Sequence, residues 1–542
     1  MWARRVRLDC RGLPSPNVWY VMRNLGRRSN RKQLSFVVVA GMVMAMFAAT
    51  MPATAATSAA AATSVRTGGD TSAEKPMTEE DARKALDAAK KVKRSQGVRG
   101  ARQVVPGRHV SGRPDATIAL TDLWNAKDSL GRSSKAAARE LLRRPKALTQ
   151  TCSDVICVHY TPGKGGDKAS VAYAKQVRDV VTKVHKLYVK AGYRKPAADK
   201  AVTPGKVDIY LQNLYDEGYY GYCAPETKVS QKAATAYCVL DNDYAASEYG
   251  SSNTPTENLR VTAAHEYFHA VQFAYDAGED RWMMESTATW AEDEVYDSIN
   301  DNRQYLAYGQ LEDQRKPMDN SSPSNLGIYG NWIFFRYLSE KFTKKRGDLP
   351  AVILGIWNRT PSTYSTTAIR QALAERGTTL KREYVRFAAA NLAPSKTYSE
   401  GRAYYPPVHD GRKVLPAKRQ TVGGKFTLKH LTYASQRLVP KKVGKGWKLR
   451  VKVDVARTNA NAAVVSVFRT DGTRGVYHLK PNRKGIATKT IKSFSSKRIR
   501  KVEVTFANAS SNFKCGQGTA FTCHGTASPD RATHRWWAKT YR

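Results

Sequence analysis

The spacing of apolar residues divides the chain into two kinds of structure, with a change near Asp410. Short apolar runs predict three β-strands, at 156–160, 207–211 and 236–240. Residues 170–191 have the periodicity of an amphipathic helix, and helical patterns predominate from 257 to about Ala393. This order of strands followed by helices predicts an α+β fold with two lobes over 151–410.

Beyond Asp410 the pattern changes to short β segments separated by Gly, Pro and Asn. The clearest segments are 448–455, 463–468 and 500–506. Together they predict a C-terminal antiparallel β-sandwich over 411–542. His524 and His534 lie in this region, and both are predicted to be surface residues.

The first 55 residues have the features of a secretory signal peptide. Basic residues at 27–32 precede an apolar stretch at 34–49, and Ala53-Thr54-Ala55 is a cleavage site of the A-x-A type. The apolar stretch is shorter than the roughly 20 residues of a membrane span. The chain is therefore predicted to be secreted, with no transmembrane segment after signal removal, and Met22 is an alternative start.

Residues 56–150 read as a linker followed by a helical segment. Residues 56–75 are rich in Ala, Thr, Ser and Gly, a composition typical of flexible linkers. Helices are predicted from 79 and within 120–142. Two interpretations stay open for this segment: a propeptide that is removed on activation, and a permanent helical extension.

Charge is distributed unevenly along the chain. Residues 151–410 carry 31 basic and 31 acidic side chains, whereas 411–542 carry 30 basic and four acidic ones. A domain with this excess attracts polyanions. An anionic cell-wall polymer is therefore a predicted partner, with a simple solubility surface as the alternative. No specific nucleic-acid partner is predicted, because no recognition motif accompanies the charge.

The cysteines support secretion. Cys10 belongs to the signal region, and the six that remain form three close pairs: Cys152 with Cys157, Cys223 with Cys238, and Cys515 with Cys523. Local disulfide pairing is the simplest of the fifteen arrangements that six cysteines allow. Zinc binding by these cysteines is disfavoured, because no pair has C-x-x-C spacing.

The motif that carries chemistry is His265-Glu266-Tyr267-Phe268-His269. Histidines at i and i+4 share one helix face, so both imidazoles can bind one zinc ion, with Glu266 placed to polarise a zinc-bound water. The helix is predicted over 257–276 with Thr256 as its N-cap. Its apolar side predicts burial and consists of Leu259, Val261, Ala264, Phe268, Val271 and Phe273. An accidental match on a solvated helix face is the alternative, and that burial argues against it.

The motif and its surroundings resemble the gluzincin class of zinc metallopeptidases over roughly residues 150–400. In that class a W-x-x-E stretch follows, here Trp282-Met283-Met284-Glu285, and the resemblance implies that Glu285 is the third zinc ligand. A further Glu seven residues on matches Glu292, as a partner for the outer N–H of a zinc-bound imidazole. Asp293 competes for that role. The departure from the class is Ser286, where many members have Gly.

Three further expectations come with the resemblance. Tyr329, in Gly327-Ile328-Tyr329-Gly330, is a candidate donor to the oxyanion of the tetrahedral intermediate, with a core tyrosine as the alternative reading of this residue. Tyr296 and the remaining histidines are the other candidates for the donor. The strand at 236–240 precedes the zinc helix, as the edge strand that binds extended peptide does in zinc peptidases. The G-x-M-E-N motif of the aminopeptidase branch is absent from the sequence, which favours an endopeptidase.

The sequence thus predicts a secreted, Zn²⁺-dependent endopeptidase that acts on protein or peptide substrates, with a basic C-terminal β-sandwich. The alternative is a non-catalytic cell-wall or matrix-binding protein on a peptidase fold, against which the intact Glu266 argues.

Overall fold

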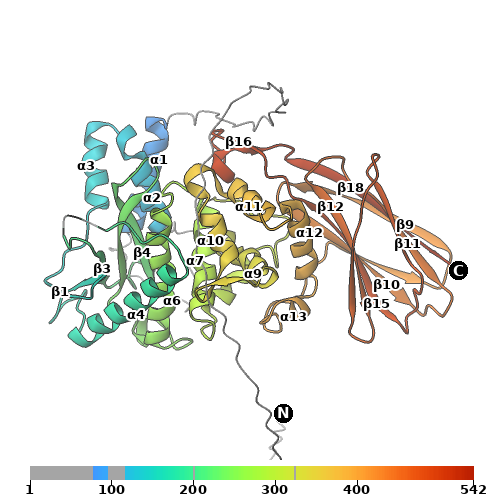
Figure 1. The fold of residues 1–542 in the computed structure, drawn as a ribbon, viewed down its shortest axis with the longest axis horizontal. Coiled ribbons are helices and arrows are strands. Elements are labelled where there is room, and N and C mark those ends of the chain that lie inside the picture. Colours follow the sequence, from blue (N-terminus) through green and yellow to red (C-terminus); the bar gives the residue numbers. More distant parts are fainter. Residues whose placement is uncertain (1–76, 95–115, 199, 201, 323–324) are drawn as a thin grey trace, which may run out of the picture. The chain divides into compact units, whose positions relative to one another are not determined.

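The computed structural model describes residues 77–94, 116–198, 200, 202–322 and 325–542. The predicted signal peptide, the alternative start at Met22 and the linker at 56–75 lie outside the described residues. Within the described residues, α-helices and β-sheets are both present in quantity (Figure 1). In that part of the chain, no helix combines the length and the apolar character that a membrane crossing requires.

A five-stranded mixed sheet forms the first half of the helix-rich region. Its order is β1-β2-β3-β5-β4, with β2, β3 and β5 parallel to one another and the two outer strands antiparallel to their neighbours. The strands are β1 (Thr149–Cys152), β2 (Ile156–Tyr160), β3 (Val207–Gln212), β4 (Gly221–Lys228) and β5 (Ala234–Asp241).

The prediction that 236–240 forms the edge strand was wrong. Strand β5 lies between β3 and β4 and is buried at every position, and β4 is the edge strand on that side of the sheet. The sequence did not predict β4 as a strand, because Gly221 and Pro225 are residues that disfavour a strand interior. In the structure Pro225 sits on an edge strand beside a register shift, one of the few places where proline fits a sheet.

Helices cover both faces of this sheet. One face packs on α4 (Val171–Lys190) and α6 (Pro255–Phe273) in the main core. The other face packs on α1 (Glu79–Arg94), α2 (Ala116–Ala126) and α3 (Arg132–Leu141). The tyrosines of β3, β4 and β5 share a buried apolar cluster with these three N-terminal helices. Residues 116–141 therefore pack on the sheet.

Helices dominate the second half of this region, up to Thr397. The ranges are α5 (Ala246–Tyr249), α7 (Arg281–Val295), η3 (Asp301–Ala307), α8 (Gly327–Gly330), α9 (Trp332–Lys341), α10 (Ala351–Trp357), α11 (Ser365–Ala374), α12 (Leu380–Asn391) and α13 (Pro394–Thr397). A two-stranded ribbon, β6 (Lys345–Arg346) with β7 (Leu349–Pro350), joins α9 to α10. Large aromatic side chains, among them Trp282, Trp290, Trp332 and Trp357, are fully buried here.

The C-terminal region consists of two facing sheets, ordered β13-β12-β15-β10-β8 and β14-β11-β18-β9. Their strands are β8 (Gly411–Pro416), β9 (Gln420–Lys429), β10 (Thr432–Lys441), β11 (Lys448–Asp454), β12 (Asn461–Arg469), β13 (Arg474–His478), β14 (Ile486–Ile491), β15 (Ile499–Asn508) and β18 (Arg531–Tyr541). One pair departs from the predicted antiparallel arrangement, because β8 runs parallel to β10. Strand β9 comes between β8 and β10 in the sequence but lies in the opposite sheet. After it, β10 runs in the same direction as β8.

The prediction for His534 was wrong, whereas His524 is exposed as predicted. Strand β18 alternates between buried and exposed positions, and His534 falls on the inward face. Its ring stacks on Phe506 at 5.2 Å between centroids. Burial lowers the pKa of His534 to about 4, so the ring is neutral at pH 7.

Candidate metal centre

The helix that carries the motif begins two residues earlier than predicted. Thr254, and not Thr256, is the N-cap: its hydroxyl accepts the backbone N–H of Glu257 at 3.2 Å. The carboxylate of Glu257 in turn accepts the backbone N–H of Thr254 at 2.8 Å. This capping box, with Pro255 at the first helical position, sets the start of α6.

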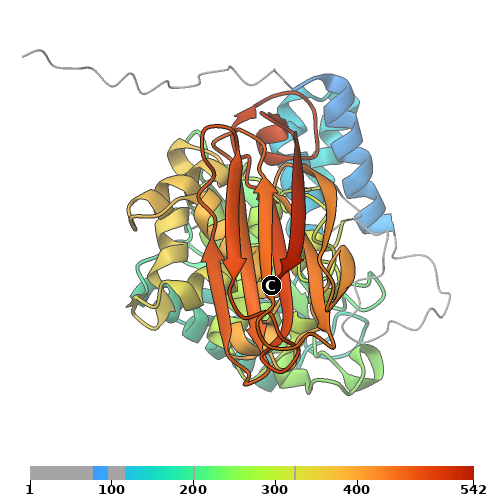
Figure 2. The ribbon, with the colours of Figure 1, turned by 90° about the vertical axis from the view of Figure 1, so that its right-hand side faces the viewer.

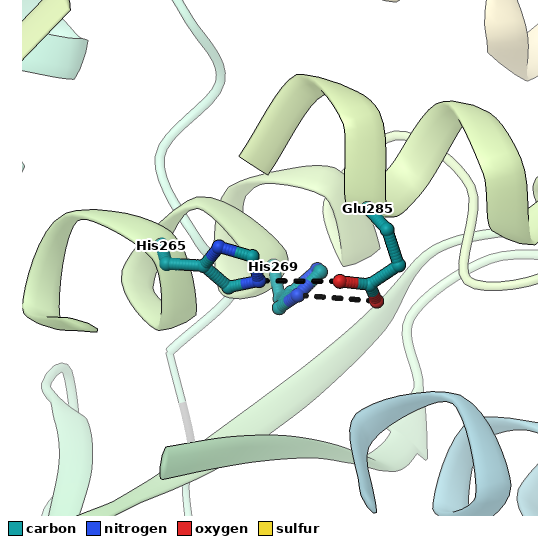
Figure 3. Close-up of side chains that lie close together, drawn as sticks. All are labelled: His265, His269 and Glu285. Atoms are coloured by element: carbon teal, nitrogen blue, oxygen red, sulfur yellow. Dashed lines mark hydrogen bonds and ion pairs between the residues drawn. The ribbon is translucent and has the colours of Figure 1, made fainter. Parts of the chain in front are cut away.

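Three predicted ligand residues meet in the structure (Figure 3). His265 and His269 lie one turn apart on α6, and Glu285 reaches them from the first turns of α7. Nε2 of His265 is 3.2 Å from one oxygen of Glu285, and Nε2 of His269 is 3.5 Å from the other. The ligand atoms of the three side chains lie within 4.8 Å of one another. This arrangement can hold a metal ion.

Two atoms of this group are buried without a hydrogen-bond partner. They are Nε2 of His269 and Oε1 of Glu285, which face each other across 3.5 Å without hydrogen-bond geometry. Buried polar atoms nearly always have a partner. A cation between the three side chains would satisfy both atoms, so the residues present fit a metal with imidazole and carboxylate ligands.

The Nδ1 atoms of both imidazoles lie within hydrogen-bond distance of further side chains. Nδ1 of His265 lies 2.5 Å from Glu292, and Nδ1 of His269 lies 2.7 Å from the amide oxygen of Gln272. The amide nitrogen of Gln272 donates to the carbonyl of Met284, which identifies the oxygen that faces His269. Nδ1 of His269 must therefore carry the proton, and its Nε2 lone pair faces Glu285.

Of the two candidate partners for the imidazole, the structure brings only Glu292 to His265. Asp293 instead forms an ion pair with Arg336 at 2.7 Å. Sequence reasoning missed Gln272, although it follows His269 by three residues on the same helix. The available signal was the i, i+3 spacing, which places Gln272 and His269 on one helix face, but a glutamine at this spacing is common without any role at a site.

Opposing electrostatic effects act on the site. Burial by itself would raise the pKa of Glu285, but His269 and His265 outweigh it and lower that pKa to about 2. Burial would lower the pKa of His265, and the bonds to Glu285 and Glu292 raise it well above its ordinary value. Burial raises the pKa of Glu292 to about 7 despite the bond to His265. Glu285 therefore stays ionised, as a metal ligand must.

Glu266 lies beside the ligands and is 7% exposed. The hydroxyl of Thr117, on α2, donates to its carboxylate at 3.3 Å. Gly221, at the start of β4, leaves room for it, because a Cβ at that position would come within 2.8 Å of Cγ of Glu266. Neither neighbour was recognisable from the sequence, because each comes from a distant segment.

Tyr329 also lies near His265. Its ring centroid is 6.2 Å from that of His265, and it stacks on Tyr305 at 5.0 Å. Ser286, the departure from the gluzincin pattern, donates a 2.5 Å hydrogen bond to the carbonyl of Ile328. This bond ties α8 to the helix that carries Glu285, so the serine has a structural role where many gluzincins have glycine.

Two other acidic groups of the described residues have ligand-like spacing, Asp241–Asp243–Glu248 and Asp293–Asp297–Glu400. The carboxylate of Asp241 is engaged by three backbone N–H groups and by the hydroxyl of Tyr249. The second group lies beside Arg336, which is the counter-ion of Asp293. Both read as structural clusters.

The three predicted disulfides are confirmed: Cys152–Cys157, Cys223–Cys238 and Cys515–Cys523. The first two join directly opposed residues of antiparallel strands. The third closes a loop whose Cys523 backbone N–H donates to Asp280, the N-cap of α7, at 2.7 Å. The β-sandwich region thus contacts the start of the helix that carries Glu285.

Comparisons with known proteins identify no family for this chain. Searches against protein-family models and curated proteins found no match. Weak structural matches include PliG, a periplasmic inhibitor of g-type lysozyme, from Aeromonas hydrophila (12% identity, 24% of this chain, 98% of that chain, TM-score 0.14). PliG of Salmonella Typhimurium (10% identity, 24% and 98%, TM-score 0.14) and a β-glucosidase from Paenibacillus barengoltzii (11% identity, 32% and 17%, TM-score 0.12) also match. Likenesses at these TM-scores support no inference about fold or function.

Proposed function

We propose that this protein is a secreted zinc-dependent endopeptidase with a zincin-like catalytic region. The supporting observation is the meeting of His265, His269 and Glu285, with two buried atoms that have no hydrogen-bond partner, beside the carboxylate of Glu266. Two imidazoles and one carboxylate form a typical ligand set for catalytic zinc, which leaves one position open. The disulfides agree with an extracellular location.

A bound zinc ion would supply a Lewis acid that polarises the scissile carbonyl. Glu266 accepts the proton of the attacking water on its carboxylate and later delivers it to the leaving amine nitrogen. Glu292 and Gln272 orient the imidazoles so that both Nε2 atoms face Glu285. Tyr329 is the proposed donor to the developing oxyanion. Extended substrate pairs with the edge strand β4.

We expect the purified mature protein to hold one zinc per chain and to digest casein. Removal of the metal with 1,10-phenanthroline should abolish digestion, and added Zn²⁺ should restore it. One zinc per chain is expected because all three ligands come from one chain. Elemental analysis and a casein assay measure both. Zinc without hydrolysis of any peptide would favour the non-catalytic binding protein, and full activity of metal-free protein would rule out the metallopeptidase.

The β-sandwich supports a second proposal, the binding of an anionic polysaccharide. The helices contact β10, β12 and β15, whereas Figure 2 shows no helix in front of the strands on the opposite side. The outward positions of the β14-β11-β18-β9 sheet carry Lys425, Lys448, Arg450, Lys452, Arg535, Trp537, Lys539 and Tyr541. We call these eight residues the basic face. Aromatic rings accept sugar faces and the cations pair with anionic groups, which favours a charged glycan.

A shallow hollow lies within the basic face. Its volume is about 410 Å³, and Gly423, Gly424, Lys425, Arg535 and Trp537 contribute to its lining. Gly423 is opposite Trp537 in the strand register, and a Cβ at Gly423 would come within 3.1 Å of the indole. Gly423 therefore lets the indole of Trp537 lie low on the sheet and leaves space beside it for one sugar ring.

We expect the full chain to bind dextran sulfate but not neutral dextran. Binding should weaken steeply between about 50 and 200 mM salt, because counterion release drives association with polyanions. The triple variant Arg450→Gln, Lys452→Gln, Lys539→Gln should bind more weakly and with a shallower salt dependence. Affinity electrophoresis measures both.

The matched control is Lys480→Gln, Arg483→Gln, Lys484→Gln, which removes the same charge from the exposed β13–β14 loop. Equal losses of affinity in the two triple variants would show that binding depends on net charge alone and not on the basic face. Tighter binding to duplex DNA than to dextran sulfate would assign the face to nucleic acid instead.

A further inference from the structure

Helix α2 (Ala116–Ala126) is inserted into the molecule beside the proposed catalytic centre. Nine of its eleven residues are buried, so it is a wedge and not a surface flap. It packs on the edge strand β4 and on the helices α1 and α3. What it contacts at β4 and at Glu266 determines whether a substrate can enter.

The first turn of α2 engages the catalytic base. The hydroxyl of Thr117 donates to Glu266 at 3.3 Å and accepts the backbone N–H of Cys223, in β4, at 3.1 Å. One side chain of α2 thus links the proposed base to the edge of the sheet. While it makes these two bonds, the hydroxyl competes with any substrate group or water that would bind the same carboxylate and N–H.

The last turns of α2 engage the same edge further along. The indole N–H of Trp124 donates to the backbone carbonyl of Glu226 in β4 at 2.7 Å. The outward N–H and C=O groups of an edge strand are the groups with which an extended peptide pairs. Each of these two groups has a side chain of α2 as its partner, so α2 and a substrate strand compete for them.

Two polar contacts hold α2 against the ligand-bearing part of the molecule. Asp122 forms an ion pair with Arg281, at the first position of α7, and Asn125 donates to the carbonyl of Ala277 at 3.1 Å. Neither contact involves Thr117 or any of the three ligands. Their removal therefore deletes no group of the metal site.

We propose that α2 is an inhibitory segment that slows substrate access to this site, so that the intact protein hydrolyses peptides slowly. It covers the edge of β4 and occupies the base Glu266, so an extended peptide reaches the centre only when α2 leaves β4. A small metal-binding molecule does not need the edge and is not excluded. This inference rests on the proposed zinc peptidase function and describes its regulation.

The test compares two probes on the zinc-loaded full chain by calorimetry: acetohydroxamate, which needs only the metal, and N-acetyl-Ala-Ala-Leu hydroxamate, which also needs the edge. The double variant Asp122→Asn, Asn125→Ala should bind the peptide hydroxamate at least tenfold more tightly than the wild type and digest casein correspondingly faster. Its affinity for acetohydroxamate should be unchanged. Asp128→Asn, an exposed change just beyond α2, is the matched control and should behave as the wild type.

The two proposals fail differently. If acetohydroxamate binds but the double variant gains nothing for the peptide probe, α2 is not inhibitory and the zinc site stands. If neither probe binds the zinc-loaded wild type or variant, the peptidase function itself is wrong.

Hydrogen exchange of the unaltered protein gives a second measurement in case the variant unfolds. The peptide hydroxamate should accelerate exchange over 116–126 at least tenfold, and acetohydroxamate should not. Peptide binding with unchanged protection of α2 would overturn the proposal.

Discussion

Replacement of Glu266 by Gln is expected to leave zinc bound and to lower kcat/KM for peptide hydrolysis by about 10²–10⁴-fold, the usual contribution of general acid–base catalysis. The amide keeps the size of the side chain and can still accept the Thr117 hydroxyl, so packing against Gly221 should be preserved. It cannot accept a proton from water at neutral pH. Zinc content and initial rates on a fluorogenic peptide measure the two effects separately.

Glu257→Gln is the matched control for this change. Glu257 lies on the same helix, and glutamine serves in a capping box as well as glutamate does. This variant should keep both zinc and activity. If Glu266→Gln retains activity within tenfold of the wild type, another group is the base.

Removal of any one ligand should have the largest effect on metal binding. His265→Ala, His269→Ala and Glu285→Ala each leave two protein ligands, and each should abolish stoichiometric zinc binding and hydrolysis. Glu292→Ala should be milder, with a loss of metal affinity of about 10–100-fold, because it removes only the partner of an imidazole. Zinc titration against a chromophoric chelator measures all four variants.

Glu285 and Glu292 form a matched pair, because both lie on α7 two turns apart and undergo the same chemical change. Gln272→Ala extends the comparison to His269 and should resemble Glu292→Ala. If Glu292→Ala strips the metal while Glu285→Ala keeps it, the ligand and its supporting carboxylate are exchanged in our assignment. Full zinc occupancy in both histidine variants would remove the site altogether.

Local patterns in the sequence were sufficient for several parts of this protein. The spacing of His265 and His269 places them on one helix face by helix geometry alone. The three disulfides follow from cysteines separated by 15 residues or fewer, since short loops close easily. Strand and helix types were also readable, with β2 predicted to the residue, because their periodicity depends on near neighbours.

Only the tertiary structure decided which distant residues and strands surround His265, Glu266 and His269. It made β4 the sheet edge, because strand order depends on pairing between distant segments. It selected Glu292 over Asp293, adjacent positions whose roles differ only through what packs against each face of α7. It brought Thr117 and Gly221 to Glu266 across separations of 149 and 45 residues, for which the sequence contains no periodic signal. The placement of His265 and His269 on one helix face was thus predictable from their spacing, whereas the groups that surround them depend on how distant segments pack.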